Sequence, residues 1–300
     1  MSVTARLLVL VLLSLTACSS SAGSSSPEPG SADVTIELAD RPFSLHVPSG
    51  YDPATKAPLV VVLHGYTSSG AEQEEYFQLK GESDRRGFLY AMPDGTVNHE
   101  KHHFWNATPA CCDFFDSGVD DSGYLIKLVD AVAAKYAVDP ARVYFVGHSN
   151  GGFMALRMAC EHADRVAAVA SLAGAATADP AKCTPARPVS VLQIHGTSDR
   201  TILYAGGPST RPYPSAEGTV KLWRGLDGCA DKADTSAQPI DLDAGLADAE
   251  TTVTAYHEGC RGGTRAELWT IQDGGHIPDL TPTFATAVTD FLLAQVAPTQ

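Results

Sequence analysis

The sequence predicts one large α/β domain, with a mostly parallel central sheet and helices on both faces. Strand-like and helix-like segments alternate along its 300 residues, and this alternation is typical of α/β folds. Several strand-like runs, such as residues 58–63 (PLVVVL), are continuously apolar, as strands buried on both faces are. The hydrophobic content of 44% suffices for one large core, and we see no internal repeat or second domain boundary.

The N-terminal segment is expected to lie outside this domain. Arg6 precedes an apolar run over residues 7–15 and then small residues, which is the order of parts in a secretory signal. The apolar run is too short for a stable membrane span. Residues 15–18 (LTAC) resemble a bacterial lipobox, in which the cysteine is acylated and becomes the new N-terminus. Ordinary secretion, with cleavage near Ala17 or in the serine tract, is the alternative.

These features divide the chain into three expected parts. Residues 1–17 form a lipoprotein signal peptide. Residues 18–32 begin with the lipidated Cys18 and form a Ser-, Gly- and Pro-rich tether that is too polar to pack. Residues 33–300 form the folded domain, which would lie just outside a membrane and be held there by lipid rather than by a helix. We therefore expect an extracytoplasmic protein, lipid-anchored to the cell membrane or secreted.

The formal charge of −14 excludes some classes of partner. It argues against nucleic acid and against docking onto anionic surfaces by charge. It fits a neutral or weakly polar substrate. We expect a monomer whose only membrane contact is the lipid anchor.

The cysteines predict disulfides. Seven cysteines minus Cys18 leave an even number, and an even number in an exported chain indicates a disulfide framework. Sequence alone permits about fifteen pairings. We expect the pairs Cys160–Cys183, which flank one strand–helix unit, Cys229–Cys260, which flank one insertion, and the adjacent Cys111–Cys112. No C-x-x-C spacing supports the alternative, a zinc site.

The α/β pattern resolves into successive elements. Strands are expected over residues 34–38, 43–47, 58–63, 88–92, 142–146, 166–172, 188–194, 251–256 and 266–271. Helices are expected over residues 72–86, 124–136, 152–161, 216–226 and 284–296. Two long connections, residues 96–122 and 200–215, interrupt the pattern. Loops of such length in a compact domain are usually functional.

Residues 147–151 (GHSNG) match the pattern of a nucleophile elbow, a serine held on a sharp turn between a strand and a helix. The expected strand at 142–146 precedes the motif, and the expected helix at 152–161 follows it. The turn strains the serine backbone, and the glycines let strand and helix pass without a Cβ clash. Ser149 is therefore the expected nucleophile. A glycine-rich turn with a surface serine is the alternative.

A serine that transfers acyl groups needs a histidine to take the Oγ proton and a carboxylate to fix the tautomer of that histidine. In folds with a nucleophile elbow, the chain order is nucleophile, acid, histidine, each at the carboxyl end of a strand. Asp199 and His276 each follow an apolar strand directly and complete this order. We therefore expect a catalytic triad of Ser149, Asp199 and His276.

Other residues compete for these roles. Five further aspartates lie between nucleophile and histidine, but none closes a core strand: Asp227, Asp231, Asp234, Asp241 and Asp243. His257 lies on the late insertion and is expected to be exposed. We interpret the histidines in or beside the turns as packing or orienting residues: His64, His148 and His195. A loop cluster could bind a metal, although loop histidines in a row are more often solvated: His99, Glu100, His102 and His103. No metal or organic cofactor is expected.

The oxyanion of the reaction needs two backbone N–H donors. One is expected from Asn150, after the nucleophile, and the other from Tyr66, in the turn that follows the strand ending at Leu63. The N-terminus of the helix beginning near Asn150 adds a favourable dipole. Four aromatic residues are candidate walls of a substrate pocket, or alternatively anchors of loops: Tyr66, Trp105, Tyr204 and Tyr213.

Several motifs recur in the order seen in one family of secreted esterases, the polyhydroxybutyrate depolymerase-like and feruloyl-esterase-like proteins. The motifs are VDD at 119–121, RVYFVGHSNGG at 142–152, HGTSD at 195–199, YAGG at 204–207, GC at 228–229 after Trp223, and GGH at 274–276. The resemblance covers residues 43–278. With the lipobox, the chain resembles an actinobacterial lipoprotein member.

This resemblance implies an α/β-hydrolase fold and hydrolysis of carboxylic esters, small or polymeric, by the triad named above. It also implies that the paired cysteines before residues 120–121 shape the site. Members often carry Trp-Pro-Gly soon after the histidine, whereas this chain has Ile277-Pro278-Asp279, so an aromatic pocket wall is expected to be missing. Two rivals remain open, a serine peptidase and a non-catalytic hydrolase-fold lipoprotein that binds a cell-wall glycan or a partner.

Overall fold

The computed structural model describes residue 1, residues 30–39 and residues 41–297. The expected signal peptide beyond Met1, the expected lipidation site Cys18 and the tether up to residue 29 lie outside the described residues. Among the residues that are described, no helix has the length and apolarity that a membrane crossing requires.

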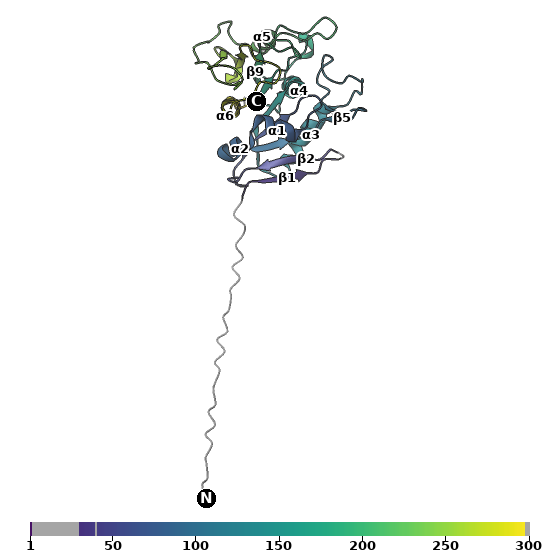
Figure 1. The fold of residues 1–300 in the computed structure, drawn as a ribbon, viewed down its shortest axis with the longest axis vertical. Coiled ribbons are helices and arrows are strands. Elements are labelled where there is room, and N and C mark those ends of the chain that lie inside the picture. Colours follow the sequence, from purple (N-terminus) through teal and green to yellow (C-terminus); the bar gives the residue numbers. More distant parts are fainter. Residues whose placement is uncertain (2–29, 40, 298–300) are drawn as a thin grey trace.

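One large sheet forms the centre of the domain (Figure 1). Its strands within the described residues are β1 (Ala32–Ile36), β2 (Phe43–Val47), β3 (Ala57–Leu63), β4 (Leu89–Met92), β7 (Val138–His148), β8 (Ala168–Leu172), β9 (Ser190–Gly196), β10 (Thr251–Tyr256) and β11 (Ala266–Ile271). They lie in the order β1-β2-β4-β3-β7-β8-β9-β11-β10. Neighbours from β4 to β11 are parallel, and β1, β2 and β10 add antiparallel edges. The predicted, mostly parallel sheet is confirmed.

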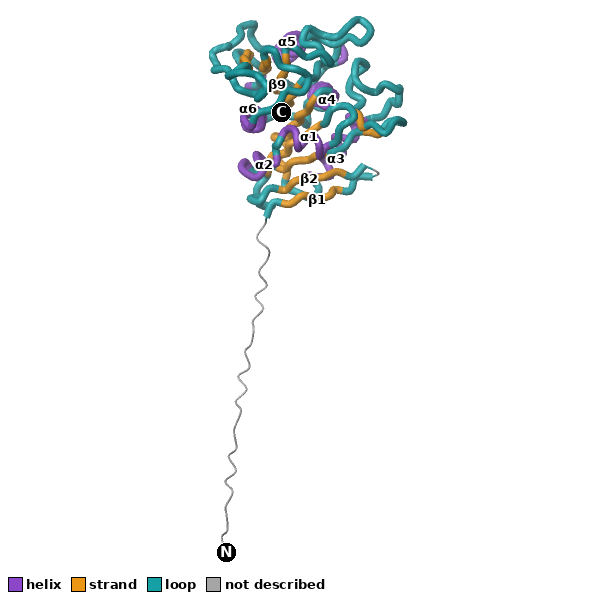
Figure 2. The backbone as a smooth tube through the Cα atoms, in the orientation of Figure 1, coloured by secondary structure: helices purple, strands orange, loops and turns teal. Residues whose placement is uncertain are grey.

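Helices cover both faces of this sheet (Figure 2). One face carries α3 (Asp121–Ala133), α4 (Asn150–Glu161) and α5 (Ala216–Asp227), and the other carries α1 (Gly70–Phe77), α2 (Lys80–Arg86) and α6 (Pro282–Leu293). Side chains of β3 alternate between the two cores, with Val61 on the first side and Val60 and Val62 on the second. Burying each such side chain contributes about 1.5–3 kcal/mol.

The single helix expected over residues 72–86 is wrong, because α1 and α2 are separate helices. Gln78 ends α1 in the left-handed conformation, with φ 54°, and its N–H donates to the Glu74 carbonyl. Phe77 and Leu79 both lie in the core under α6. Two residues apart on one continuous helix would point to nearly opposite sides. The break lets both side chains enter the same core.

The long connections contain little regular structure. Residues 96–122 hold one small antiparallel ladder between β5 (Thr96–Val97) and β6 (His103–Phe104). Outside these connections, short 3₁₀ turns occur at Pro180–Lys182 and Arg261–Gly263. The remaining expected strands and helices are present, with boundaries shifted by a few residues.

Three disulfides join the described cysteines, in the pairs expected from the sequence. Cys160, at the end of α4, is bonded to Cys183, and Cys229 is bonded to Cys260 across the insertion between α5 and β11. Cys111 is bonded to its neighbour Cys112 within the first long connection. Cross-links of this kind stabilise mainly by restricting the unfolded chain. Cys229 follows the end of α5 and Cys260 precedes β11, so this disulfide lies at the amino edge of the sheet.

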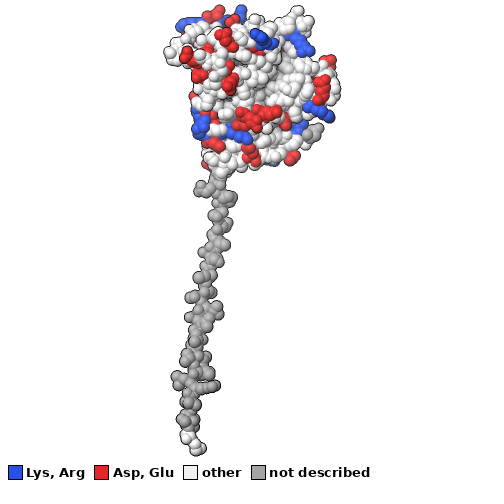
Figure 3. Space-filling model, in the orientation of Figure 1, with Lys and Arg blue, Asp and Glu red and all other residues white. Residues whose placement is uncertain are grey.

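The surface carries both signs of charge. On the face shown in Figure 3, acidic and basic side chains are interspersed, with acidic ones more frequent, in keeping with 35 acidic and 21 basic residues in the chain.

The turn between β7 and α4 is closely packed. A Cβ on Gly147 would lie 2.3 Å from the backbone of Gly151, and a Cβ on Gly151 would lie 2.0 Å from the carbonyl oxygen of Leu63. Real Cβ atoms do not approach backbone atoms so closely. The two glycines therefore allow the strand, the helix and the end of β3 to meet beside Ser149.

Replacing Gly147 by Ala should therefore prevent folding or lower the free energy of unfolding by more than about 4 kcal/mol. Gly225→Ala is the matched control. Gly225 lies in α5 with open space where its Cβ would be, so that change should raise stability by about 0.5–1 kcal/mol. Urea unfolding of both variants measures the difference. A Gly147→Ala protein with the wild-type midpoint would contradict the described turn.

Asp227 is a buried carboxyl group at the end of α5. Its Oδ1 accepts the N–H of Val189 at 3.2 Å, while Oδ2 has no hydrogen-bond partner among the described residues. Burial raises the pKa of Asp227 to about 7. The negative end of the helix dipole also disfavours the charged form.

The folded pKa of Asp227 lies above the unfolded value of about 3.9. Between these values the folded state keeps a proton that the unfolded chain has lost. The free energy of unfolding should therefore fall as pH rises from about 4 to 7, by a few kcal/mol at most. Asp227→Asn should flatten this slope in urea unfolding at pH 5, 6, 7 and 8, whereas Asp241→Asn, at an exposed position, should keep it. Equal slopes in both variants would contradict the assignment.

Candidate active site

Three side chains from three loops meet at the carboxyl edge of the sheet. The Oγ of Ser149 lies 2.9 Å from Nε2 of His276, and Nδ1 of His276 lies 2.7 Å from Oδ2 of Asp199. Ser149 follows β7, Asp199 follows β9 and His276 follows β11. The parallel strands thus bring together the three residues selected from the sequence.

Asp199 is anchored and charged. Its Oδ1 accepts the N–H groups of Thr201 at 2.8 Å and Ile202 at 2.9 Å. Burial alone would raise the pKa of Asp199, but hydrogen bonds from His195 and His276 outweigh it and hold the pKa well below its usual range. Because the carboxylate accepts, Nδ1 of His276 must carry the proton. Nε2 of His276 is then free to accept the Ser149 proton.

Two further histidines hold this arrangement from behind. His148 Nε2 donates to the backbone carbonyl of His276 at 2.9 Å, and burial lowers the pKa of His148 to about 4, so the ring stays neutral. His195 Nε2 lies 2.7 Å from the Ile202 carbonyl and 3.3 Å from Asp199 Oδ2. His148 therefore orients the backbone of the His276 loop, and His195 orients the loop that begins with Asp199.

Ser149 has the strained backbone that an elbow requires, with φ 53° and ψ −118°. Asn150 is the first residue of α4, so its N–H points out of the helix N-terminus. Within the described chain, the N–H groups of Tyr66 and Asn150 donate to no other group. Two amides are therefore available beside the serine.

The side chain of Asn150 has a role that the sequence did not reveal. Its Oδ1 accepts the Trp105 N–H at 2.7 Å, and its Nδ2 donates to the Trp105 carbonyl at 2.9 Å. The Trp105 indole N–H donates to the His64 carbonyl at 3.1 Å. The first long connection is thereby tied to both the elbow and the turn after β3.

Two expected pocket walls are corrected by the structure. Trp105 has no exposed surface, and Tyr213 is 9% exposed. The Tyr213 hydroxyl accepts the Leu203 N–H at 2.9 Å, and its ring packs against Phe153. Both residues anchor loops because their hydrogen bonds and packing face the protein.

Tyr66 and Tyr204 remain partly exposed. The Tyr66 ring lies 5.1 Å from that of Phe114. Tyr204 lines a groove of about 550 Å³ with Tyr256 and Thr270, and its ring meets His195 edge-on at 5.8 Å.

Asp121 organises the first long connection through hydrogen bonds to three segments of the chain. It has no exposed surface. Its Oδ1 accepts Arg41 Nη1 at 2.7 Å and Thr96 Oγ1 at 2.9 Å, and its Oδ2 accepts the Asn106 N–H at 2.7 Å. Only the VDD motif of the resemblance marked this position.

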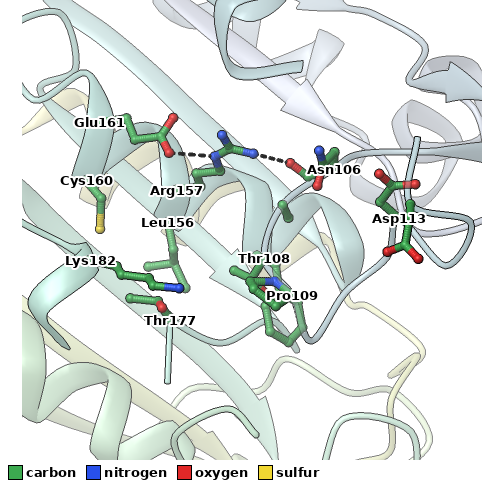
Figure 4. Close-up of a pocket in the computed structure, with 13 residues that line it drawn as sticks. Asn106, Thr108, Pro109, Asp113, Leu156, Arg157, Cys160, Glu161, Thr177 and Lys182 are labelled. Carbon is green, nitrogen blue, oxygen red and sulfur yellow. Dashed lines mark hydrogen bonds and ion pairs between the residues drawn. The ribbon is translucent and has the colours of Figure 1, made fainter. Parts of the chain in front are cut away.

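A separate cavity of about 490 Å³ lies beside α4 (Figure 4). Leu156 and Pro109 contribute apolar surface, and Lys182 extends along it. Arg157 crosses the upper side, with Nε bonded to Glu161 Oε1 at 2.8 Å and Nη1 to the Asn106 carbonyl at 2.5 Å. The lining contains none of the three residues that meet at Ser149.

The loop histidines have other partners. His103 Nδ1 lies 3.1 Å from the Gly95 carbonyl, and His102 Nδ1 lies 3.6 Å from Glu100 Oε2. In the part of the chain that the structure describes, no three metal-binding side chains converge.

Residues 42–268 match the family model described as Esterase PHB depolymerase. The chain is 30% identical over 240 residues to "Feruloyl esterase B" of Piromyces equi, covering 76% of this chain and 41% of that protein. It is 29% identical to "Putative esterase NocK" of Nocardia uniformis subsp. tsuyamanensis, covering 81% of this chain and 72% of that protein.

A solved acetyl xylan esterase from Aspergillus awamori superposes with a TM-score of 0.61 at 16% identity, covering 88% of this chain and 98% of that chain. This likeness shows the fold, which is that of the α/β-hydrolases. The chain spans less than half the length of the Piromyces relative, 41%.

Proposed function

We propose that this chain, which belongs to the esterase PHB depolymerase family, is a serine carboxylic-ester hydrolase with Ser149, His276 and Asp199 as its catalytic triad. The observation that carries the proposal is the unbroken path Ser149 Oγ–His276 Nε2 at 2.9 Å and His276 Nδ1–Asp199 Oδ2 at 2.7 Å. Relatives and structural neighbours named as esterases support it.

The direction of each proton transfer follows from the tautomer of His276, which carries its proton on Nδ1 and has Nε2 free beside Ser149 Oγ. His276 Nε2 takes the Ser149 proton while Oγ attacks the ester carbonyl carbon. The N–H groups of Tyr66 and Asn150 bind the oxyanion. Imidazolium at His276 is stabilised by Asp199 and protonates the leaving alcohol. The same histidine then activates a water, which attacks the acyl-enzyme and releases the acid and Ser149. The residues of the chain supply every proton transfer in this cycle.

We propose esters with an apolar part as the substrates. Three large apolar side chains are exposed: Ile277 at 69%, next to His276, Leu203 at 41%, four residues after Asp199, and Phe114 at 41%, whose ring lies 5.1 Å from that of Tyr66. Ile277 directly follows His276, where an aromatic wall was expected to be missing. Relatives named feruloyl esterase and acetyl xylan esterase, and the polyester in the family's description, suggest feruloyl, acetyl or hydroxybutyrate esters as candidates.

We propose that the mature domain acts outside the cytoplasm and is anchored through lipid on Cys18. The lipobox-like LTAC sequence supports the anchor, and the three disulfides support an oxidising compartment.

Ser149→Ala should abolish labelling by a fluorophosphonate probe and lower ester hydrolysis by about 10⁵–10⁶-fold, because no other group can form the acyl-enzyme. The assay compares acetyl, butyryl, feruloyl and hydroxybutyrate esters with amides of the same acids. Ser236→Ala, in the distant insertion, is the control. Hydrolysis that survives Ser149→Ala would show another nucleophile, and preference for the amides would show a peptidase. A folded wild-type protein that is neither labelled nor active would support a binding role.

Cys18→Ala should remove lipid from the protein. In a bacterial host with a lipoprotein pathway, fed with an alkyne-tagged fatty acid, the wild-type protein should be labelled and membrane-bound, and the variant should be unlabelled. Cys229→Ala is unsuitable as a control because it breaks a disulfide, so Ser19→Ala serves instead. An unlabelled wild-type protein in the medium would indicate ordinary secretion.

A further inference from the structure

His64 is a buried histidine that the proposed chemistry does not use. Its side chain has no exposed surface, and both ring nitrogens contact backbone groups. Nε2 lies 2.8 Å from the amide nitrogen of Gly95, and Nδ1 lies 2.7 Å from the carbonyl oxygen of Gly65. These two contacts hold the ring between the end of β4 and the turn after β3.

The partners determine the tautomer of His64. A backbone N–H can only donate, so Nε2 must accept the bond from Gly95. Nδ1 then carries the proton and donates to the Gly65 carbonyl. Burial lowers the pKa of His64 to about 4, so this neutral form persists at neutral pH.

The bond to Gly65 determines the direction of the next amide. The Gly65 carbonyl and the Tyr66 N–H belong to one planar trans peptide, in which C=O and N–H point in opposite directions. Holding the carbonyl toward His64 therefore aims the Tyr66 N–H away from it. Within the described chain this N–H has no other acceptor. The Ser68 N–H also donates to the Gly65 carbonyl, at 3.2 Å, which further restrains this peptide.

The hydrogen bonds continue upstream with the same polarity. Arg41 Nη2 donates to the Asp94 carbonyl at 3.0 Å, and the N–H of that same peptide, on Gly95, donates to His64. Hydrogen bonds arranged head to tail polarise one another. This series of hydrogen bonds therefore begins at the guanidinium of Arg41, whose Nη1 lies 2.7 Å from Oδ1 of Asp121. It ends at the Tyr66 N–H.

We propose that His64 is a positioning residue of the oxyanion hole, which fixes and polarises the Tyr66 N–H through the Gly65 peptide. This inference rests on the proposed function, because it assumes that the Tyr66 amide binds the oxyanion. His64 touches no reacting atom and acts only through that peptide.

Three substitutions separate the two bonds of His64. His64→Asn places its amide near the Nδ1 position and can keep the bond to Gly65. His64→Gln reaches the Nε2 position and can keep the bond to Gly95 alone. His64→Leu keeps neither. His46→Gln is the matched control, because His46 is also buried and bonded at both ring nitrogens, to Asp33 and Asp84, away from the site.

The measurements are kcat per fluorophosphonate-titrated site, KM for a p-nitrophenyl ester, and Ki for an alkylboronic acid, whose serine adduct places an oxygen in the oxyanion hole. Losing an oxyanion donor typically costs about 10²–10³ in kcat. His64→Leu should lower kcat by about 10–100-fold with little change in KM, and Ki should rise by a similar factor. His64→Asn should stay within about 5-fold of wild type, and His64→Gln should resemble the leucine variant.

A residue with only a structural role would lower the number of titratable sites and leave kcat per site and Ki unchanged. That result for the His64 variants would overturn the positioning role while the wild-type activity upholds the proposed function. If His64→Leu fails to fold, the two other variants test the proposal, which expects a higher kcat per titrated site for His64→Asn than for His64→Gln. Equal kcat values for these two variants would overturn the proposal. A wild-type protein without esterase activity would overturn both proposals.

Discussion

The close approach of three backbone segments at the nucleophile turn is the constraint on which the rest of the site depends. Gly151 lies so near the end of β3 that a Cβ would come within 2.0 Å of the Leu63 carbonyl oxygen. This contact places the turn that carries Tyr66 directly beside Ser149. Two amides from different loops can then face one point, which an oxyanion hole requires. No side-chain interaction could substitute for this proximity of backbones.

The parallel sheet supplies the second condition, a rigid edge from which loops project. Ser149, Asp199 and His276 lie at the ends of β7, β9 and β11, and β8 separates the first two strands. Regular ladder hydrogen bonds hold these ends at constant spacing. Local hydrogen bonds then fix the orientation of each group. The amides of residues 201 and 202 donate to Asp199, and His148 donates to the backbone of the His276 loop.

Sequence reasoning predicted the parts of the fold that depend on local pattern and order. Apolar runs predicted the strands, and residues at strand ends predicted which side chains meet near Ser149. It failed where contacts between segments far apart in the sequence determine the local structure. The break at Gln78 exists because Phe77 and Leu79 share one core. Trp105 is an anchor because Asn150 and the His64 carbonyl bind it, and Asp121 is a hub because Arg41, Thr96 and Asn106 converge on it. None of these contacts has a signature in neighbouring residues.

The histidines around the site show how burial divides one residue type into different roles. His64 and His148 are buried, and burial lowers the pKa of both to about 4. Their N–H groups are committed to backbone carbonyls, so they behave as fixed neutral donors. His276 differs because its Nε2 faces a hydroxyl that can lose a proton, while its Nδ1 faces a carboxylate. Several imidazoles can therefore lie close together without competing for the Ser149 proton. The backbone groups bind the rings of His64 and His148, and only His276 has a ring nitrogen beside the serine.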